Sequence, residues 1–287
     1  MNQKPLEKVE LFLLKKGFIV KSLTRSSFDI LARKEGVILL VKVLEDANSI
    51  NREYSEEMTS IASCISASSI IVADKAGARL QDNVVYVRFG MWTINPITFF
   101  NCINSKMPFI MSNQAGLTAS LDSAKLKDKR EELGHSINSV SKMVGVSGRM
   151  IFNYESRDSE VTVNTALKIH RIFGDNVFDE INIFETKAAT PNKCTTDIAN
   201  KYVNLGFEAA DTRKTPFNEI AKKDNQIILT EVGDKVNPEV KSLSKLIDAD
   251  NLVIFDKKKP KDLPSITKKE FFEFEEANDL IKFLKEF

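Results

Sequence analysis

Two polar residues in the middle of the chain, Arg149 and Asn153, carry side chains that can read a DNA base pair. Arginine can donate two hydrogen bonds to the O6 and N7 atoms of guanine, and asparagine can pair in the same bidentate way with adenine. Because they are four positions apart, both side chains would project from one face of a helix. We predict that Arg149 contacts a base or a phosphate and that Asn153 also contacts DNA.

Six more residues of the same segment complete the predicted DNA-binding set. Four of them suit a phosphate held at a helix N-terminus or in a loop, although capping or solvent exposure explains them equally well. These four are Ser136, Asn138, Ser147 and Arg157. The other two, Gly148 and Met150, lie beside Arg149. Gly148 departs from the usual pattern, because a residue facing DNA normally has a side chain and glycine lowers helix stability by about 1 kcal/mol.

Short amphipathic helices would position these residues. The apolar spacing predicts five of them, over residues 121–133, 136–144, 147–155, 163–173 and 177–184. Ser136 and Ser147 are suitable N-caps for the second and third helices, and Gly145 accepts the left-handed conformation that the intervening turn needs. The same spacing assigns the predicted core to Ile137, Val140, Val144, Val146, Ile151, Leu167 and Ile172.

Residues 126–173 resemble the helix-turn-helix of the Cro/cI type of phage repressor. The likeness includes the serine that opens the second helix, the Val-Gly-Val-Ser turn at residues 144–147, and Ile151 followed by Tyr-Glu in the third helix. It covers about a fifth of the chain. The resemblance implies an all-α bundle of five helices in which the third helix enters the major groove.

The flanks of this segment repeat each other. Residues 17–43 and 206–232 align without a gap and share eight of 27 positions, and residues 70–75 then match residues 252–257. We interpret this as a duplicated domain with a different domain between its copies. Linkers are expected over residues 107–120 and 187–196. The predicted domains are therefore residues 1–112, 113–187 and 188–287, in a multidomain α+β chain.

Each copy shows apolar periods that predict a helix, three strands, a helix and a strand, which gives an α/β domain around a small mixed sheet. This order resembles the restriction-endonuclease-like fold of the PD-(D/E)xK nucleases. Those enzymes hold Mg²⁺ with two carboxylates and use a lysine to assist the attacking water. Asp29 and Lys42 stand where the first and last of these residues would be, but Leu40 occupies the middle acidic position.

The second copy departs from the nuclease pattern at every position, with Asn218, Leu229 and Glu231. We predict that no residue of either copy is catalytic and that Asp29 and Lys42 are surface charges at strand ends. A Mg²⁺-dependent structure-specific nuclease stays open as an alternative function.

The composition limits the other function classes. With 43% hydrophobic and 28% charged residues the chain can bury ordinary cores, and a net charge of +1 means that any DNA-binding surface is local. Residues 121–157 hold seven basic and five acidic side chains, whereas residues 158–187 hold three and six. The positive side of the central segment is thus the side with the predicted DNA-binding set.

The chain has few of the cysteine and histidine residues that metal binding and redox chemistry use. The three cysteines are widely spaced and the histidines number two, so we expect neither a metal site nor a cofactor. No apolar run approaches the ~20 residues of a membrane span, and the charged N-terminus lacks the apolar core of an export signal. These features predict a cytoplasmic protein without a membrane partner.

The central segment decides the predicted function. We expect a transcriptional regulator, similar to archaeal regulators of this layout, that binds double-stranded DNA as a homodimer on a pseudo-palindromic site. The residues name no small-molecule effector. A protein-interaction adaptor, in which the helical domain contacts a protein instead of DNA, is the second alternative, and failure to bind any duplex would favour it.

Overall fold

The computed structural model describes residues 4–186 and 194–286, which form two compact units. One unit contains residues 4–77 and 89–91 together with the chain from residue 184 onward, and the other contains residues 78–88 and 92–183. Most of the linker expected at residues 187–196 lies outside the described residues.

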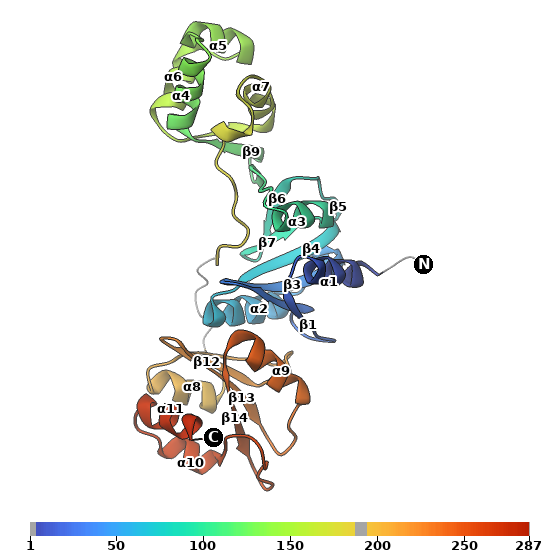
Figure 1. Cartoon of the computed structure of the whole chain (residues 1–287), viewed down its shortest axis with the longest axis vertical. Helices are drawn as coiled ribbons and strands as arrows, with labels where there is room; N and C mark the ends of the chain where they lie inside the picture. The colour runs from blue at the N-terminus through green and yellow to red at the C-terminus, as the bar shows by residue number, and fades with distance from the viewer. Residues whose placement is uncertain (1–3, 187–193, 287) are drawn as a thin grey trace. The chain divides into compact units, whose positions relative to one another are not determined.

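The N-terminal copy of the repeat has the predicted order of elements (Figure 1). Its elements are α1 (Pro5–Lys15), β1 (Ile19–Ser22), β2 (Ile30–Lys34), β3 (Val37–Asp46), a 3-10 turn (Ala47–Ser49), α2 (Arg52–Ile65) and β4 (Ser68–Ala76). Strands β1, β2 and β3 pair antiparallel in that order, and β4 joins β3 in parallel. The parallel pair needs a crossover, which α2 supplies.

The C-terminal copy repeats this topology and extends it. Its elements are α8 (Asp197–Asn204), β11 (Glu208–Asp211), β12 (Glu219–Lys223), β13 (Gln226–Val232), α9 (Pro238–Ile247), β14 (Asp250–Phe255), β15 (Ser265–Thr267), α10 (Lys268–Glu273) and α11 (Ala277–Lys285). Even the register is shared: Ala32 pairs with Val20 and Leu39, and Ala221 pairs with the equivalent Ala209 and Ile228. The two copies are therefore the same fold, as a duplication requires.

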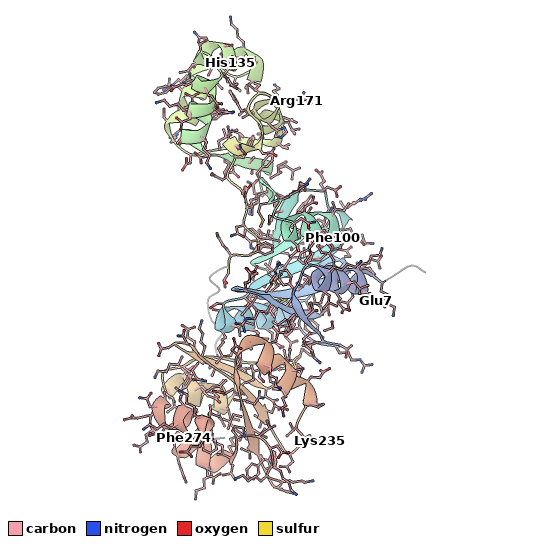
Figure 2. All side chains as sticks on the ribbon, in the orientation of Figure 1. Glu7, Phe100, His135, Arg171, Lys235 and Phe274 are labelled. Carbon is pink, nitrogen blue, oxygen red and sulfur yellow. The ribbon has the colours of Figure 1, made fainter. Side chains whose placement is uncertain are left out.

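The core of the C-terminal copy is built around aromatic residues. Tyr202 is fully buried, with its ring centroid 5.5 Å from that of Phe207 and 5.0 Å from that of Phe271. Its hydroxyl shares a hydrogen bond of 2.7 Å with the Thr230 hydroxyl, so the buried polar atom is satisfied. Phe274, labelled in Figure 2, packs on the edge of this core.

The two copies pack against each other through equivalent elements. Helix α2 of the first copy contacts β11 and β12 of the second, and α9 of the second contacts β1 and β2 of the first. Because α2 and α9 are equivalent, as are the strand pairs, the contact is reciprocal in the manner of a two-fold interface.

Basic side chains at equivalent positions of the two copies each bind the C-terminus of a helix in the other copy. Arg33 donates from Nη1 to the carbonyl oxygen of Leu246 (2.9 Å) and pairs with Asp248 at the C-terminus of α9. Lys222, its counterpart, donates from Nζ to the Ser66 hydroxyl (2.9 Å) at the C-terminus of α2. Cations are favourable there because the helix dipole is negative at that end.

One contact between the copies lacks this symmetry. The buried carboxylate of Glu57 on α2 accepts hydrogen bonds from the backbone nitrogens of Arg213 (3.0 Å) and Lys214 (3.1 Å). The Ser27 backbone nitrogen donates to the carbonyl oxygen of Lys214 (2.8 Å). Burial raises the pKa of Glu57, although these hydrogen bonds oppose that rise.

The second unit combines short strands with the central helices. Its elements are β5 (Ala78–Arg79), β6 (Val84–Arg88), most of β7 (Met91–Ile94), α3 (Pro96–Ile103), β8 (Ile110–Asn113), β9 (Gly116–Leu121), α4 (Ser123–Glu132), α5 (Ile137–Val144), α6 (Gly148–Ser156), β10 (Ser159–Thr162), α7 (Val163–Phe173) and a 3-10 turn (Asp175–Val177). Strand β8 pairs with β6 in parallel and with β9 antiparallel, and β10 pairs with β9 antiparallel.

Two sequence predictions for this unit are wrong. Residues 107–120, expected as a linker, contain the β8–β9 hairpin. The fifth helix expected at residues 177–184 is replaced by the 3-10 turn and an extended segment, in which Phe178 bridges to Leu121 and stacks on Phe109 at 4.5 Å. These aromatic and strand contacts hold the segment along β9, so the bundle has four α-helices.

The predicted core of the helical part is correct except at one position. Val140, Val144 and Ile151 are buried, and Ile137, Val146 and Ile172 are partly buried against the same cluster. Leu167 is 45% exposed, because it lies on the outer face of α7 while Ala166 and Ile169 point inward.

Candidate nucleic-acid interface

Helices α5 and α6 form the helix-turn-helix, and local sequence determines where each begins and ends. The Ser136 hydroxyl accepts from the Ser139 backbone nitrogen (3.1 Å), and the Ser147 hydroxyl accepts from the Met150 backbone nitrogen (3.2 Å). Gly145 ends α5 at a φ of 78°, the left-handed conformation that glycine adopts without strain. Lys168 on α7 donates to the carbonyl oxygen of Val144 (2.9 Å), which completes the turn.

One face of α6 is held in the core and the opposite face is open. Ile151 and Tyr154 are buried, whereas Arg149 is exposed and Asn153 is half-exposed. Since residues three and four apart share a helix face, the outward face carries Arg149, Asn153 and Ser156 together. The predicted base-reading pair therefore shares an accessible face of the second helix.

The rest of the predicted set borders this face. Five of its members are exposed and Gly148 is half-exposed; the exposed ones are Ser136, Asn138, Ser147, Met150 and Arg157. The caps Ser136 and Ser147 lie at the N-termini of α5 and α6. Arg157 lies at the other end of α6, in a groove that also holds Asp158 and Glu160, so its surroundings are more acidic.

Gly148 has a packing explanation that the sequence did not reveal. A Cβ atom added to it would lie 3.1 Å from Oδ1 of Asn138 and 3.7 Å from Cγ2 of Ile137. The first turns of α5 and α6 thus approach closely at this point, and a residue without a side chain permits it. Gly148 therefore leaves room for the side chains of Asn138 and Ile137.

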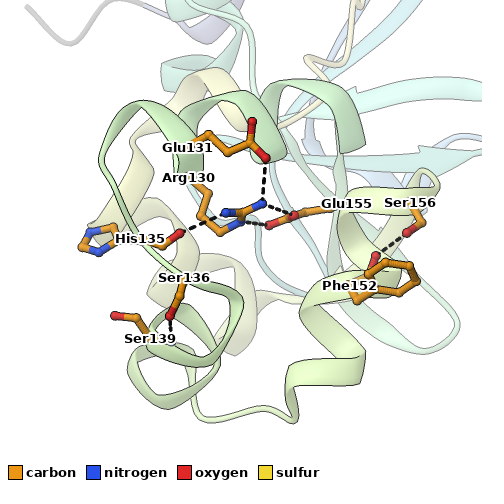
Figure 3. A network of polar contacts seen from close by, with 8 residues as sticks. All are labelled: Arg130, Glu131, His135, Ser136, Ser139, Phe152, Glu155 and Ser156. Carbon is orange, nitrogen blue, oxygen red and sulfur yellow. Dashed lines mark hydrogen bonds and ion pairs between the residues drawn. The ribbon is translucent and has the colours of Figure 1, made fainter.

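An ion pair that sequence reasoning missed fixes α6 to α4 (Figure 3). Arg130 donates from Nε to Oε1 of Glu155 (2.6 Å) and from Nη2 to Oε2 (2.9 Å), and from Nη1 to the carbonyl oxygen of His135 (3.0 Å). The side chains of Arg130 and Glu155 are 11% and 6% exposed. This bidentate, mostly buried pair sets the angle of α6, and the pairing raises the pKa of Arg130.

The nuclease-like residues of the N-terminal copy, Asp29 and Lys42, lie together and form an ion pair with each other. Lys42 donates from Nζ to Oδ1 of Asp29 (2.9 Å) and to the carbonyl oxygen of Ser26 (2.8 Å), while Oδ2 of Asp29 accepts from the Val43 backbone nitrogen (2.8 Å). The side chain of Asp29 is only 16% exposed and that of Lys42 only 14%, so the expectation of two surface charges is wrong. Leu40 is fully buried.

In the C-terminal copy the uncharged Asn218 takes the place of Asp29, and the buried Glu231 takes the place of Lys42. Oδ1 of Asn218 accepts from the Val232 backbone nitrogen (2.8 Å), as Asp29 accepts from Val43. The backbone nitrogen of Asn218 donates to the Thr230 carbonyl oxygen, as that of Asp29 does to Val41. Asp29 thus has a structural role that an amide also fills. Within residues 4–186 and 194–286, no three His, Cys, Asp or Glu side chains cluster as metal ligands.

These contacts predict a graded response at position 29. Asp29→Ala should lower the free energy of unfolding by about 2 kcal/mol, because Lys42 loses its ion-pair partner and the Val43 backbone nitrogen loses its hydrogen-bond acceptor. Asp29→Asn, which copies Asn218, should lower it by only about 1 kcal/mol, because the amide oxygen keeps the Val43 hydrogen bond. Urea unfolding of both variants measures this, and equal losses would contradict the structural role.

Comparisons with known proteins agree with this architecture. A family model described as a PD-(D/E)XK superfamily domain matches residues 2–108, and a helix-turn-helix model matches residues 126–174. No solved structure matches the chain. Among the described helices, none has the length and apolar character to cross a membrane.

Curated relatives match over almost the whole length. A protein of Methanocaldococcus jannaschii is 30% identical over 97% of this chain and 95% of its own. Relatives from Archaeoglobus fulgidus (32% identical, 98% and 97% covered) and Thermococcus kodakarensis (25%, 99% and 95%) match similarly. All three are provisionally named HTH-type transcriptional regulatory proteins. The chain therefore belongs to this family of archaeal helix-turn-helix regulatory proteins.

Proposed function

We propose that the protein regulates transcription by binding double-stranded DNA, with α6 in the major groove. The observation that carries this proposal is the pair Arg149 and Asn153, exposed on one face of the second helix of a helix-turn-helix. Both side chains have the bidentate geometry that distinguishes purines by their major-groove edges. The names of the relatives point to the same role.

Phosphate contacts would orient the helix. Ser136, Asn138 and Ser147 lie at or near the N-termini of α5 and α6, where backbone N–H groups and the helix dipole attract anions. The serine hydroxyls accept capping bonds and still carry a proton that can be donated to a phosphate oxygen. Arg157 would add a phosphate contact from the C-terminal end of α6.

A homodimer would supply the affinity that one helix-turn-helix lacks. Seven basic and five acidic residues over residues 121–157 leave a small local charge, and a single domain reaches few base pairs. Two copies would place their recognition helices about 34 Å apart, one turn of the duplex, and so read an inverted repeat.

Selection of random duplexes by the full-length protein tests the proposal. We expect an inverted repeat, bound with a stoichiometry of two chains per duplex. If no duplex is selected, DNA recognition fails and the protein-interaction adaptor gains support; if one chain occupies one half-site, only the dimer is wrong.

Two arginines should then separate base reading from phosphate binding. Arg149→Ala should weaken binding to the selected duplex by about 1 to 3 kcal/mol and relax the preference at one base position. Arg157→Ala should weaken selected and scrambled duplexes about equally and flatten the salt dependence. Titrations at two salt concentrations measure both effects. Arg171→Ala, which removes an exposed charge from α7, is the matched control (Figure 2).

We further propose that the flanking copies form a scaffold and do not cleave DNA. Leucines 40 and 229 occupy the acidic position in the two copies, and the Asp29 carboxylate is engaged by Lys42 and Val43. Cleavage of linear, branched or single-stranded DNA that depends on Mg²⁺ or Mn²⁺ and is abolished by Asp29→Ala would establish the nuclease alternative instead.

A further inference from the structure

Phe152 is a large apolar side chain that α6 turns toward solvent. It is 58% exposed, more than the other exposed apolar residues of the helical region, which are Leu133, Met143, Met150 and Leu167. Figure 3 shows its ring directed away from the Arg130–Glu155 pair, while the Ser156 hydroxyl donates to its backbone carbonyl oxygen at 2.6 Å. The ring is thus available for a contact outside the chain.

The neighbours of Phe152 indicate what kind of contact this is. It lies three residues after Arg149, so the two side chains are neighbours on the surface of α6, and Asn153 lies on the other side of Arg149, four residues after it. Arginine and phenylalanine are enriched in protein interfaces too, so the composition of this face does not choose between a protein and DNA. Its place on the second helix of a helix-turn-helix favours DNA, because that helix is the one that enters the major groove. The mixture does suit a major groove, where each base pair presents polar edges and some present a methyl group.

We propose that Phe152 is a third specificity-determining residue of α6, which packs against the C5-methyl group of a thymine beside the bases read by Arg149 and Asn153. This inference rests on the proposed function. Thymine is the one DNA base with an apolar group in the major groove, and phenylalanine is among the residues that contact it. Hydrogen-bonding neighbours set the register, and the aromatic ring selects the methyl group.

The size of the effect follows from the area of one methyl group. Removing about one methyl group from a buried apolar contact weakens it by a factor of about three to five. Uracil is thymine without this methyl group, and 5-methylcytosine carries it at the same position of cytosine. Replacing thymine by uracil, or cytosine by 5-methylcytosine, leaves base pairing unchanged. A change in affinity on either replacement is therefore due to the methyl group alone.

The experiment uses the selected duplex with its thymines replaced one at a time by deoxyuridine. The full-length wild type should lose affinity three- to fivefold at one thymine of each half-site. Phe152→Ala should bind the thymine and uracil duplexes equally. Phe152→Leu should lose affinity on the uracil duplex by less than the wild type does and by more than Phe152→Ala does. Leu167→Ala, which truncates a comparably exposed side chain on α7, should keep the wild-type sensitivity. Thermal unfolding checks that each variant is folded.

The outcomes separate this inference from the function on which it rests. If the wild type selects a duplex and depends on Arg149 but is indifferent to every uracil, Phe152 does not read a methyl group. The same conclusion follows if Phe152→Ala retains the uracil penalty or the selected half-site contains no thymine. A protein that selects no duplex overturns the proposed function, and this inference falls with it.

Discussion

Arg130→Ala should lower the free energy of unfolding of the helical unit by about 3 kcal/mol, because it leaves the Glu155 carboxylate buried without its partner. The guanidinium also holds the His135 carbonyl oxygen in the turn between α4 and α5, so three elements lose a common anchor. Since the pair sets the angle of α6, binding to the selected duplex should fall as well. Urea unfolding followed by circular dichroism measures the stability change.

Two variants of the same helix sharpen this test. Arg130→Lys keeps the charge but not the planar fork, so an intermediate loss is expected. Lys129→Ala removes an ion pair with Glu132 whose side chains are 36% and 65% exposed, and it should change stability by less than about 0.5 kcal/mol. If Arg130→Ala is as mild as Lys129→Ala, the buried pair is not the anchor of α6.

Glu219→Ile should stabilise the C-terminal copy, and the gain should depend on pH. Glu219 is 2% exposed; its Oε1 accepts from the Thr196 hydroxyl (2.7 Å), and Oε2 has no hydrogen-bond partner among the described residues. Burial raises the pKa of Glu219 to about 7, and the nearby Asp211 carboxylate adds to the rise. Position 30, its equivalent in the first copy, is a fully buried isoleucine, so this fold accepts that side chain.

The direction of the pH dependence follows from the raised pKa. Below pH 4.5 the carboxyl group is protonated in both the folded and the unfolded chain, so its ionisation does not lower the free energy of unfolding there. Between pH 4.5 and 7 only the unfolded chain ionises, and the free energy of unfolding falls as pH rises, by an amount on the order of 3 kcal/mol. Above pH 7 the loss is complete.

Unfolding of wild type and Glu219→Ile at pH 4, 6 and 8 measures this dependence. The difference between the two proteins should be small at pH 4 and largest at pH 8, with the isoleucine variant the more stable. Thr196 is half-exposed, so water can replace the lost carboxylate at its hydroxyl group. A constant difference across this range would show that Glu219 does not titrate as its burial indicates.

Sequence periodicity was sufficient for the features that depend on local order. Both flanking copies show the predicted order of helix, three strands, helix and strand, and Ser136 and Ser147 cap the helices that they were expected to cap. These features arise from apolar spacing and from side chains that bond to backbone two or three residues away. Arg149 and Asn153 share an open face for the same reason.

Contacts between distant residues were not predictable in this way. Arg130 and Glu155 are 25 positions apart, and nothing in the spacing of charges distinguishes them from neighbouring surface charges. The segment after α7 has enough apolar residues for a helix, but its stacking on Phe109 favours an extended path. Asp29 and Lys42 are similar, because their position at strand ends suggested exposure to solvent. In the fold they pair with each other, and the Tyr54 ring of α2 and the Ser26 carbonyl oxygen also contact Lys42.

The reciprocal contact between the flanking copies differs from a homodimer in what dilution and mutation can do to it. Both halves belong to one polypeptide, so their association does not weaken as protein concentration falls. Each half can also change alone, as the contact of Glu57 with the backbone of Arg213 and Lys214 illustrates. A DNA-binding curve that is steeper than the hyperbola of one chain on one site would therefore report contacts between chains and not between the copies.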